Sequence, residues 1–222
     1  MGRAASSADP RSAANGKETG RVEAFSDGVF AIAITLLVLD LKVPPLAERG
    51  RLVDGLLGQW PVYAAYVISF LFILIMWINH HWMFEHIARI DSTFMLLNGL
   101  LLLGITVVPF PTNVVATYIL TPDQNVAAAL YNGWFLLIAV FFGLLWQYAS
   151  RHGRLLTRAD DEAGLAQVIT DRYRWGPLAY LTAFVLSFVW APASLLLNFL
   201  LAVFYALPRD MRWPWQRGAR TT

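Results

Sequence analysis

The chain has 222 residues, of which 57% are hydrophobic and 14% are charged, and its mean hydropathy is +0.51. This composition is typical of all-α proteins that cross a membrane several times, and we find no segment that indicates a soluble domain. The absence of cysteine excludes disulfide frameworks, thiolate metal sites and thiol catalysis. The net charge of +2 points to no particular partner before the charges are placed along the chain.

Residues 1–20 are polar and rich in Ser, Ala and Gly, without the apolar core of a signal peptide. We expect them to form a disordered cytoplasmic tail. The opening MGRAAS fits the myristoylation pattern, which is short and weakly specific.

The first hydrophobic segment, 21–41, carries charges where a lipid-facing helix would have none. Only 12 uncharged residues separate Asp27 from Asp40, whereas a lipid-facing span needs about 20 apolar residues. A helix over the whole segment brings Arg21, Glu23 and Asp27 to the membrane edge or inside it. Ionisable groups at such depth usually face protein or water and mark a functional path. We therefore expect this helix to line a pathway.

Four further stretches lack Asp, Glu, Lys and Arg, namely 55–84, 92–122, 124–150 and 175–208. The first three predict one membrane helix each, and Pro109 and Pro111 predict the end of the third helix. The fourth stretch is too long for one span, and Ala191-Pro192 predicts a turn between helices at about 171–190 and 192–207. The predicted total, with the first segment, is six helices in a membrane domain over 21–208.

The basic residues predict the orientation of these helices. With the N-terminus in the cytoplasm, 14 of the 17 basic residues lie inside, and only Lys42, Arg49 and Arg51 lie outside. The positive-inside rule thus favours six spans in the cell's inner (plasma) membrane with both termini cytoplasmic. The tail 209–222, with tryptophans among arginines, predicts an interfacial anchor in contact with membrane lipids. The polar loop 151–174 could form a short amphipathic helix at the membrane surface.

One face of the first helix combines small, aliphatic and hydroxyl side chains. At about 100° per residue, four side chains fall within about 60° of one another, and these are Gly28, Ile32, Thr35 and Leu39. Leu36 flanks this stripe, while Asp27 points roughly 120° away from it, towards a neighbouring helix. Ordinary helix packing is the alternative interpretation of the stripe.

A second cluster, MWINHHWMFEH, lies at the predicted cytoplasmic end of the second helix. Trp77 shares a helix face with His80 or His81. His80, His81, Glu85 and His86 raise the possibility of a metal site, but their spacing turns the side chains to different faces. We expect no metal, and instead histidines that hydrogen-bond a carboxylate such as Asp27.

Arg21-x-x-x-Phe25-Ser26-Asp27 at the start of the first helix, followed by GVFAIAIT, resembles the signature of the transmembrane-protein-175 family, and Trp77-x-x-His80 resembles its second-helix motif. This family comprises the endolysosomal potassium channel and its bacterial relatives. The resemblance implies a homotetramer of six-helix subunits whose first helices line a pore, without the TVGYG filter of ordinary potassium channels. It implies no enzyme activity, no cofactor and no nucleic-acid partner, with K⁺ as the permeant ion.

By the same resemblance, Ile32 matches a hydrophobic constriction, Thr35 a ring of hydroxyls and Leu39 a second apolar ring. Gly28 and Leu36 complete the implied pore wall. A buttressing network behind that wall is implied for the remaining motif residues, which are Arg21, Phe25, Ser26, Asp27, Trp77 and His80.

Other functions stay open at this point. A pathway with substantial proton permeability fits the same motif. A secondary transporter or membrane-embedded enzyme is disfavoured because we find neither an internal repeat nor a catalytic motif. A purely structural membrane protein would leave Arg21 and Asp27 without a purpose.

Overall fold

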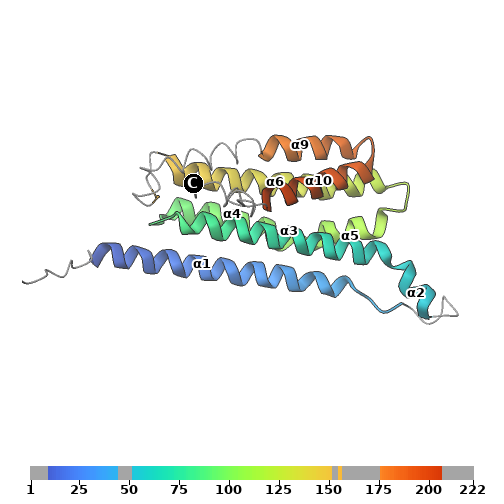
Figure 1. The fold of residues 1–222 in the computed structure, drawn as a ribbon, viewed down its shortest axis with the longest axis horizontal. Coiled ribbons are helices and arrows are strands. Elements are labelled where there is room, and N and C mark those ends of the chain that lie inside the picture. Colours follow the sequence, from blue (N-terminus) through green and yellow to red (C-terminus); the bar gives the residue numbers. More distant parts are fainter. Residues whose placement is uncertain (1–9, 45–51, 152–154, 157–175, 207–222) are drawn as a thin grey trace, which may run out of the picture.

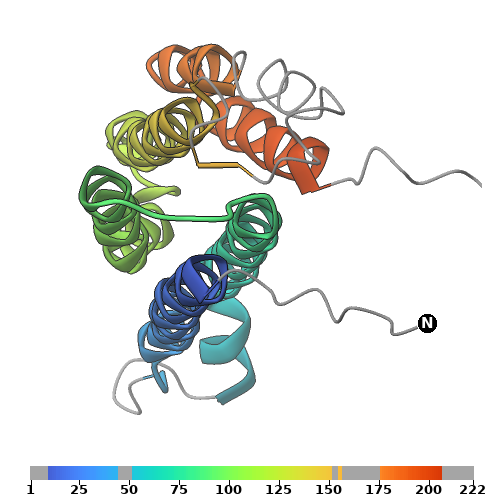
Figure 2. The same ribbon diagram turned by 90° about the vertical axis from the view of Figure 1, so that its left-hand side faces the viewer.

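The computed structural model describes residues 10–44, 52–151, 155–156 and 176–206, and within them the long helices run side by side (Figure 1). The elements are α1 (Pro10–Leu36), the 3-10 helix η1 (Leu37–Asp40), α2 (Leu52–Gly58), α3 (Trp60–Glu85), α4 (Ser92–Val107), α5 (Pro109–Tyr118), α6 (Gln124–Ser150), α9 (Gly176–Ser187) and α10 (Ala191–Ala206). In both ribbon views α1 and α9 lie at opposite sides of the bundle, with α3, α4 and α6 between them (Figures 1 and 2).

Four helical segments are long and apolar enough to cross a membrane. They are Gly16–Asp40, Trp60–Glu85, Ser92–Tyr118 and Gln124–Ser150. The described parts of α9 and α10 have 12 and 16 residues, fewer than the roughly 20 that a perpendicular span requires. The first four predicted spans are therefore present, and the fifth and sixth appear as a hairpin of shorter apolar helices.

The first helix begins earlier than the sequence predicts. α1 starts at Pro10, so the expectation of a disordered tail over 1–20 is wrong for residues 10–20. Proline suits the first turn of a helix because its missing N–H has no partner there in any case. Three predictions concern residues outside the described ones: the tail over 1–9, the amphipathic helix within 158–174, and the interfacial anchor over 209–222.

Pro109 and Pro111 interrupt the third span without ending it. α4 ends at Val107, as expected, but the helix resumes at once as α5 from Pro109. Each proline falls in the first turn of α5, where the ring clashes with no preceding carbonyl of the same helix. The apolar segment thus continues to Tyr118.

The last two helices meet at a tight turn. α9 ends at Ser187, three residues before the predicted end at Trp190, and α10 begins at Ala191. The backbone N–H groups of Phe188 and Val189 bond back to Val185 and Leu186 (3.2 and 3.0 Å). Residues 171–175 of the predicted helix lie outside the described residues.

Large aromatic side chains fill the interior between the helices. Phe30, Phe72, Phe94, Phe135 and Trp146 are each 2% exposed or less. Apolar packing alone distinguishes poorly between protein and lipid neighbours, so polar contacts between helices help to fix the arrangement.

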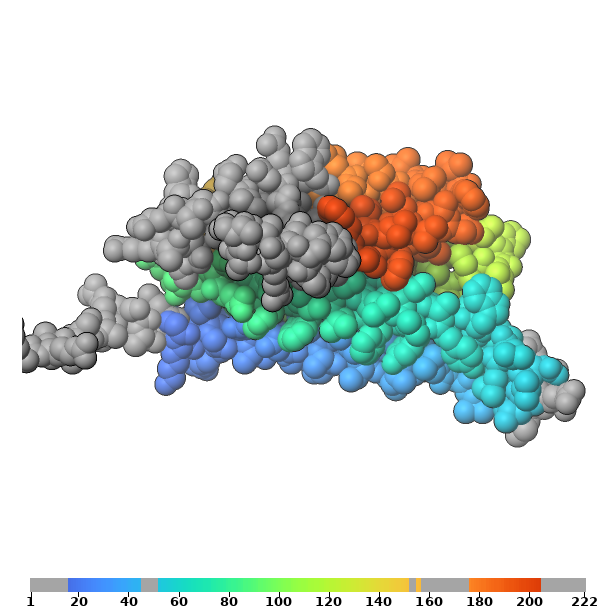
Figure 3. Space-filling view, viewed as in Figure 1, coloured from blue at the N-terminus to red at the C-terminus, as the bar shows by residue number. Residues whose placement is uncertain are grey.

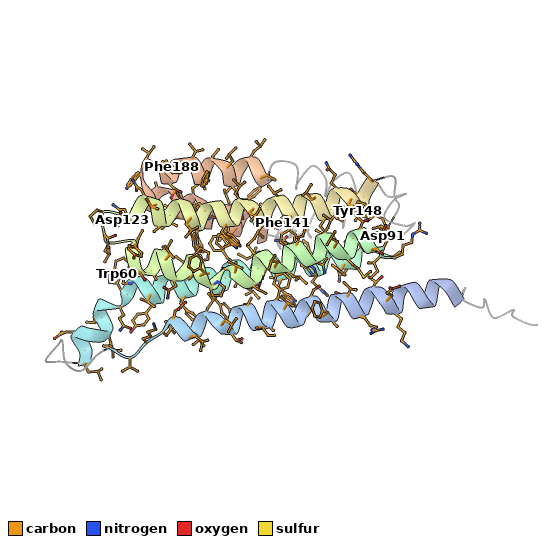
Figure 4. All side chains as sticks on the ribbon, turned by 180° about the vertical axis from the view of Figure 1, so that it is seen from behind. Trp60, Asp91, Asp123, Phe141, Tyr148 and Phe188 are labelled. Carbon is orange, nitrogen blue, oxygen red and sulfur yellow. The ribbon has the colours of Figure 1, made fainter. Side chains whose placement is uncertain are left out.

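Two polar contacts illustrate how the helices are held together. Asn132 of α6 donates to Ser187 of α9 (2.7 Å) and to Ser194 of α10 (3.0 Å). Tyr148 and Asp91 lie at the same end of the bundle (Figure 4), where the Tyr148 hydroxyl donates to Asp91 (2.7 Å). The same carboxylate caps α4 by accepting from the Phe94 N–H (2.9 Å). Apart from the cap of α4, these contacts join segments far apart in the sequence.

Candidate functional site: the uncovered face of α1

α1 packs on α3 and α4 along one side and leaves its other side uncovered. Phe30 is 1% exposed and lies in the core, whereas Ile32 is 58% and Leu39 is 68% exposed. The remaining members of the predicted stripe, Gly28, Thr35 and Leu36, are also exposed. The structure therefore leaves all five predicted pore residues exposed, four on the uncovered side of α1 and Leu39 on η1, which follows it.

The Thr35 hydroxyl has a defined orientation on this face. Its Oγ1 donates to the Ile32 carbonyl at 2.8 Å. A hydroxyl that uses its hydrogen in this way keeps a lone pair free to accept a hydrogen bond or to contact a cation. The uncovered face thus presents an oxygen about one turn away from Ile32, among aliphatic side chains.

Asp27 points away from the uncovered face and binds α3. The Trp77 indole Nε1–H donates to Asp27 Oδ1 at 2.8 Å. This contact joins two residues of the predicted network. The carboxylate acts here as the acceptor that fixes α1 against α3.

A second side-chain contact between α1 and α3 lies one turn from the first. His81 Nδ1 lies 2.9 Å from Glu23 Oε1, and the His81 ring stacks on Trp77 with centroids 5.9 Å apart. The spacing of four residues on both helices places Glu23 beside His81 and Asp27 beside Trp77. We expected histidines that hydrogen-bond a carboxylate such as Asp27. His81 does pair with a carboxylate, but it is that of Glu23, whereas Asp27 accepts from the Trp77 indole.

His80 belongs to a separate contact that reaches α4. Its Nε2 lies 3.0 Å from Asn98 Oδ1, and Asn98 Nδ2 donates to Ser26 Oγ at 3.0 Å. All three side chains are buried, and the Ser26 hydroxyl donates in turn to the Val22 carbonyl (2.9 Å). Asn98 therefore connects α1, α3 and α4, a role that the sequence analysis missed. A single amide within the otherwise apolar helix 92–107 was the signal that could have found it.

Two residues of the predicted network stay outside it. Phe25 is 67% exposed, and Arg21 is also exposed on the same side of α1. The predicted network is thus divided into the Asp27–Trp77 pair and the Ser26–Asn98–His80 set, while Arg21 and Phe25 extend the uncovered face.

The residues considered as metal ligands have different partners. His80 binds Asn98, His81 lies between Glu23 (2.9 Å) and Glu85 (3.6 Å), and the His86 Nδ1 lies 2.7 Å from the Trp82 carbonyl. Within the described ranges, no group of three His, Cys, Asp or Glu side chains could hold a metal ion.

η1, which directly follows α1, is attached to the bundle by a further polar contact. Asn113 of α5 donates to Asp40 Oδ1 at 2.6 Å. The charge of Asp40 therefore faces a neighbouring helix, which explains how a carboxylate ends this apolar segment.

Comparison with known proteins gives a consistent picture. A potassium channel of Chamaesiphon minutus is 50% identical over 192 residues, which cover 86% of this chain and 94% of the relative. A potassium channel of Streptomyces collinus is 49% identical over 190 residues, with 85% and 91% covered. The family model for the endosomal/lysosomal potassium channel TMEM175 matches residues 21–109. The chain belongs to the TMEM175 family.

A solved structure and vertebrate relatives extend this comparison. The crystal structure of a lysosomal potassium-selective channel TMEM175 homolog from Chamaesiphon minutus matches 86% of this chain and 97% of its own, with a TM-score of 0.78 and 48% identity. The human relative, named an endosomal/lysosomal proton channel, is 33% identical over 141 residues, and the match spans 28% of its length.

The part of the chain that matches the TMEM175 family model contains the candidate site except for Asn113 of α5. Residues 21–109 include the uncovered face of α1, the α3 residues that contact it, and Asn98 of α4. α6, α9 and α10 lie outside the matched segment. The TMEM175 signature therefore coincides with the contacts that position α1.

Proposed function

We propose that this protein is the subunit of a potassium-permeable channel whose pore is lined by the uncovered faces of several α1 helices. The observation that carries the proposal is the apolar stripe on α1, which is exposed while the opposite side of the same helix is packed and hydrogen-bonded. Lipid would suit the aliphatic side chains of this face, but Arg21, which is exposed on the same side of α1, favours further protein or water there. The names of the two closely similar bacterial relatives support K⁺ as the permeant ion.

The proposed assembly is a homotetramer. One α1 helix cannot enclose a pathway, and copies of one chain usually assemble around a closed symmetry axis. Each subunit contributes six spans in this proposal, with α9 and α10 as the fifth and sixth. Both termini are cytoplasmic, and the complex lies in the inner membrane.

The proposed constriction is a ring of Ile32 side chains. Bulky aliphatic side chains at one level of a narrow pore favour dewetting, so the barrier to an ion is the loss of its water. K⁺ gives up water at a lower cost than Na⁺, and the Thr35 oxygens can replace part of the hydration shell. Modest preference for K⁺ over Na⁺ follows, with Leu39 as a second apolar ring and Gly28 and Leu36 along the wall.

The experiment that tests this function measures currents from purified protein in planar bilayers. Under opposing K⁺ and Na⁺ gradients, we expect a reversal potential displaced towards the K⁺ equilibrium potential. Native mass spectrometry of the same sample should show a tetramer. A sample that contains only monomers, or that carries no cation current, would contradict the proposal.

Proton permeation is a second candidate function, favoured by the name of the vertebrate relatives as proton channels. A pH gradient imposed in the same bilayers, with K⁺ equal on both sides, separates the two. A reversal potential that follows the proton gradient would favour the second candidate over the first.

A further inference from the structure

α2 carries a row of aliphatic side chains that the described chain leaves uncovered. They are exposed by 64%, 60%, 41% and 69%, and they form what we call the α2 stripe: Leu52, Val53, Leu56 and Leu57. The last three follow Leu52 by one, four and five residues, which places all four within an arc of about 140° on a helix. Four such side chains in water at the end of a membrane span are unfavourable, so the stripe requires a partner.

The opposite side of α2 lies against the Pro44 side chain. Gly55 is buried, and a Cβ atom added there would lie 2.8 Å from Pro44 Cβ. Gly55 lies about 130° around the helix from the middle of the stripe. This contact leaves α2 little freedom to rotate, so the stripe cannot be covered by turning it towards its own bundle.

The position of α2 indicates which partner covers the stripe. In two perpendicular views α2 lies on the α1 side of the bundle, opposite α9 and α10 (Figures 1 and 2). It also projects from the end of the molecule in the space-filling view (Figure 3). In the proposed channel the α1 side faces the common axis and the other copies, and the α9 and α10 side faces lipid. A lipid contact for α2 would require the bilayer to reach the inner side of the assembly.

We infer that the α2 stripe packs against a second copy of this chain at the outer end of the assembly. The inference rests on the proposed oligomeric channel, and it adds a specific subunit contact to it.

The test uses the absence of cysteine in the chain, so that single cysteines can be labelled with a fluorescent bimane. Leu57→Cys reports on the stripe, and Val53→Cys is a second variant with the same purpose. Asp54→Cys lies outside the stripe, about 130° around the helix from its middle. Leu196→Cys is a lipid-facing reference on α10, where Leu196 is 59% exposed. The labelled full-length proteins are reconstituted with brominated phosphatidylcholine, or exposed to iodide.

We expect the label at Leu57→Cys to be protected from both quenchers, while Leu196→Cys is quenched by brominated lipid and Asp54→Cys by iodide. Quenching of the stripe positions by brominated lipid to the level of Leu196→Cys would establish a lipid contact and overturn the inference. Quenching by iodide to the level of Asp54→Cys would establish a water-exposed surface and overturn it equally.

Native mass spectrometry of each labelled sample separates this inference from the proposed function. A tetramer that is retained with Asp54→Cys but lost on labelling Leu57→Cys also supports a subunit contact. If the unmodified protein is monomeric, the channel proposal itself fails. If the unmodified protein is tetrameric and the stripe is quenched, only the α2 contact is wrong.

Discussion

At the scale of single residues, neighbouring positions of α1 have opposite surroundings. Ile32 is exposed by 58%, and Phe30, two positions earlier, is exposed by 1%. Both are large apolar side chains, so it is their position on the helix, and not their chemistry, that buries one and exposes the other. Phe30 packs within the subunit, with its ring 5.3 Å from that of His80, whereas Ile32 is available to a pathway.

The first prediction concerns the proposed constriction. Ile32→Asn should assemble normally, raise single-channel conductance and weaken the preference for K⁺ over Na⁺, because an amide wets the narrow ring. Phe30→Asn is the matched control and should lower folded yield, since it places a polar group in the core at a cost of about 3–5 kcal/mol. Bilayer recordings and size-exclusion profiles provide the measurements. Wild-type flux in Ile32→Asn, together with altered selectivity in Phe30→Asn, would show that the pore face is assigned wrongly.

The second prediction concerns the contact between Asp27 and Trp77. Asp27→Ala leaves the Trp77 N–H without its acceptor and should lower the free energy of unfolding by about 1–3 kcal/mol. Asp27→Asn keeps an oxygen acceptor, so its free energy of unfolding should fall by less than that of Asp27→Ala. The measurement is thermal unfolding in detergent. A double-mutant cycle of Asp27→Ala and Trp77→Phe then gives the coupling energy between the two side chains. An Asp27→Ala protein of unchanged stability but altered ion preference would instead place the carboxylate in the ion path.

At the scale of helices, the candidate site depends on how α1 is held. Trp77 and His81 of α3 fix one side of it, and Asn98 of α4 contacts Ser26 at 3.0 Å. These contacts lie on the side opposite the stripe, so they position the proposed pore face without being part of it. In the membrane interior such polar contacts specify which helix faces meet.

The third prediction tests Asn98 as the link among the three helices. Asn98→Leu leaves the buried His80 Nε2 without its partner, while Ser26 keeps its bond to the Val22 carbonyl. The variant should therefore lower stability by about 1–3 kcal/mol. Asn79→Leu is the matched control, because the Asn79 amide bonds only the Ile75 carbonyl of its own helix (3.0 Å) among the described residues. Protease resistance and thermal unfolding in detergent give the measurement. Equal losses in the two variants would argue against a special role for Asn98.

At the scale of the whole molecule, two lysines bracket the first span. Lys17 lies near the start of the segment Gly16–Asp40, and Lys42 follows its end. Both side chains are exposed. The positive-inside rule assigns Lys17 to the cytoplasm and Lys42 to the outer side.

The fourth prediction tests that orientation with single cysteines in the cysteine-free chain. A membrane-impermeant maleimide should label Lys42→Cys in intact cells and Lys17→Cys only after the membrane is opened. The unmodified chain provides the background. The reverse pattern would show that the N-terminus is on the outer side, and labelling of both sites in intact cells would show that the segment does not span.

The sequence by itself determined the membrane class, the first four spans, the turn before α10 and the family. These features follow from local quantities, namely runs of apolar residues, proline positions and a short motif around Asp27. The helical period also placed Ile32, Thr35 and Leu39 on one face before any neighbour was known.

Only the tertiary structure decided which polar groups meet. Asp27 could pair with several donors on a neighbouring helix, and the packing of α1 on α3 selected Trp77 and gave His81 to Glu23. Asn98 is far from Ser26 and His80 in sequence, and no local pattern encodes their contact. The exposure of the α2 stripe is likewise a result of packing, because an apolar heptapeptide can be buried or uncovered with the same sequence.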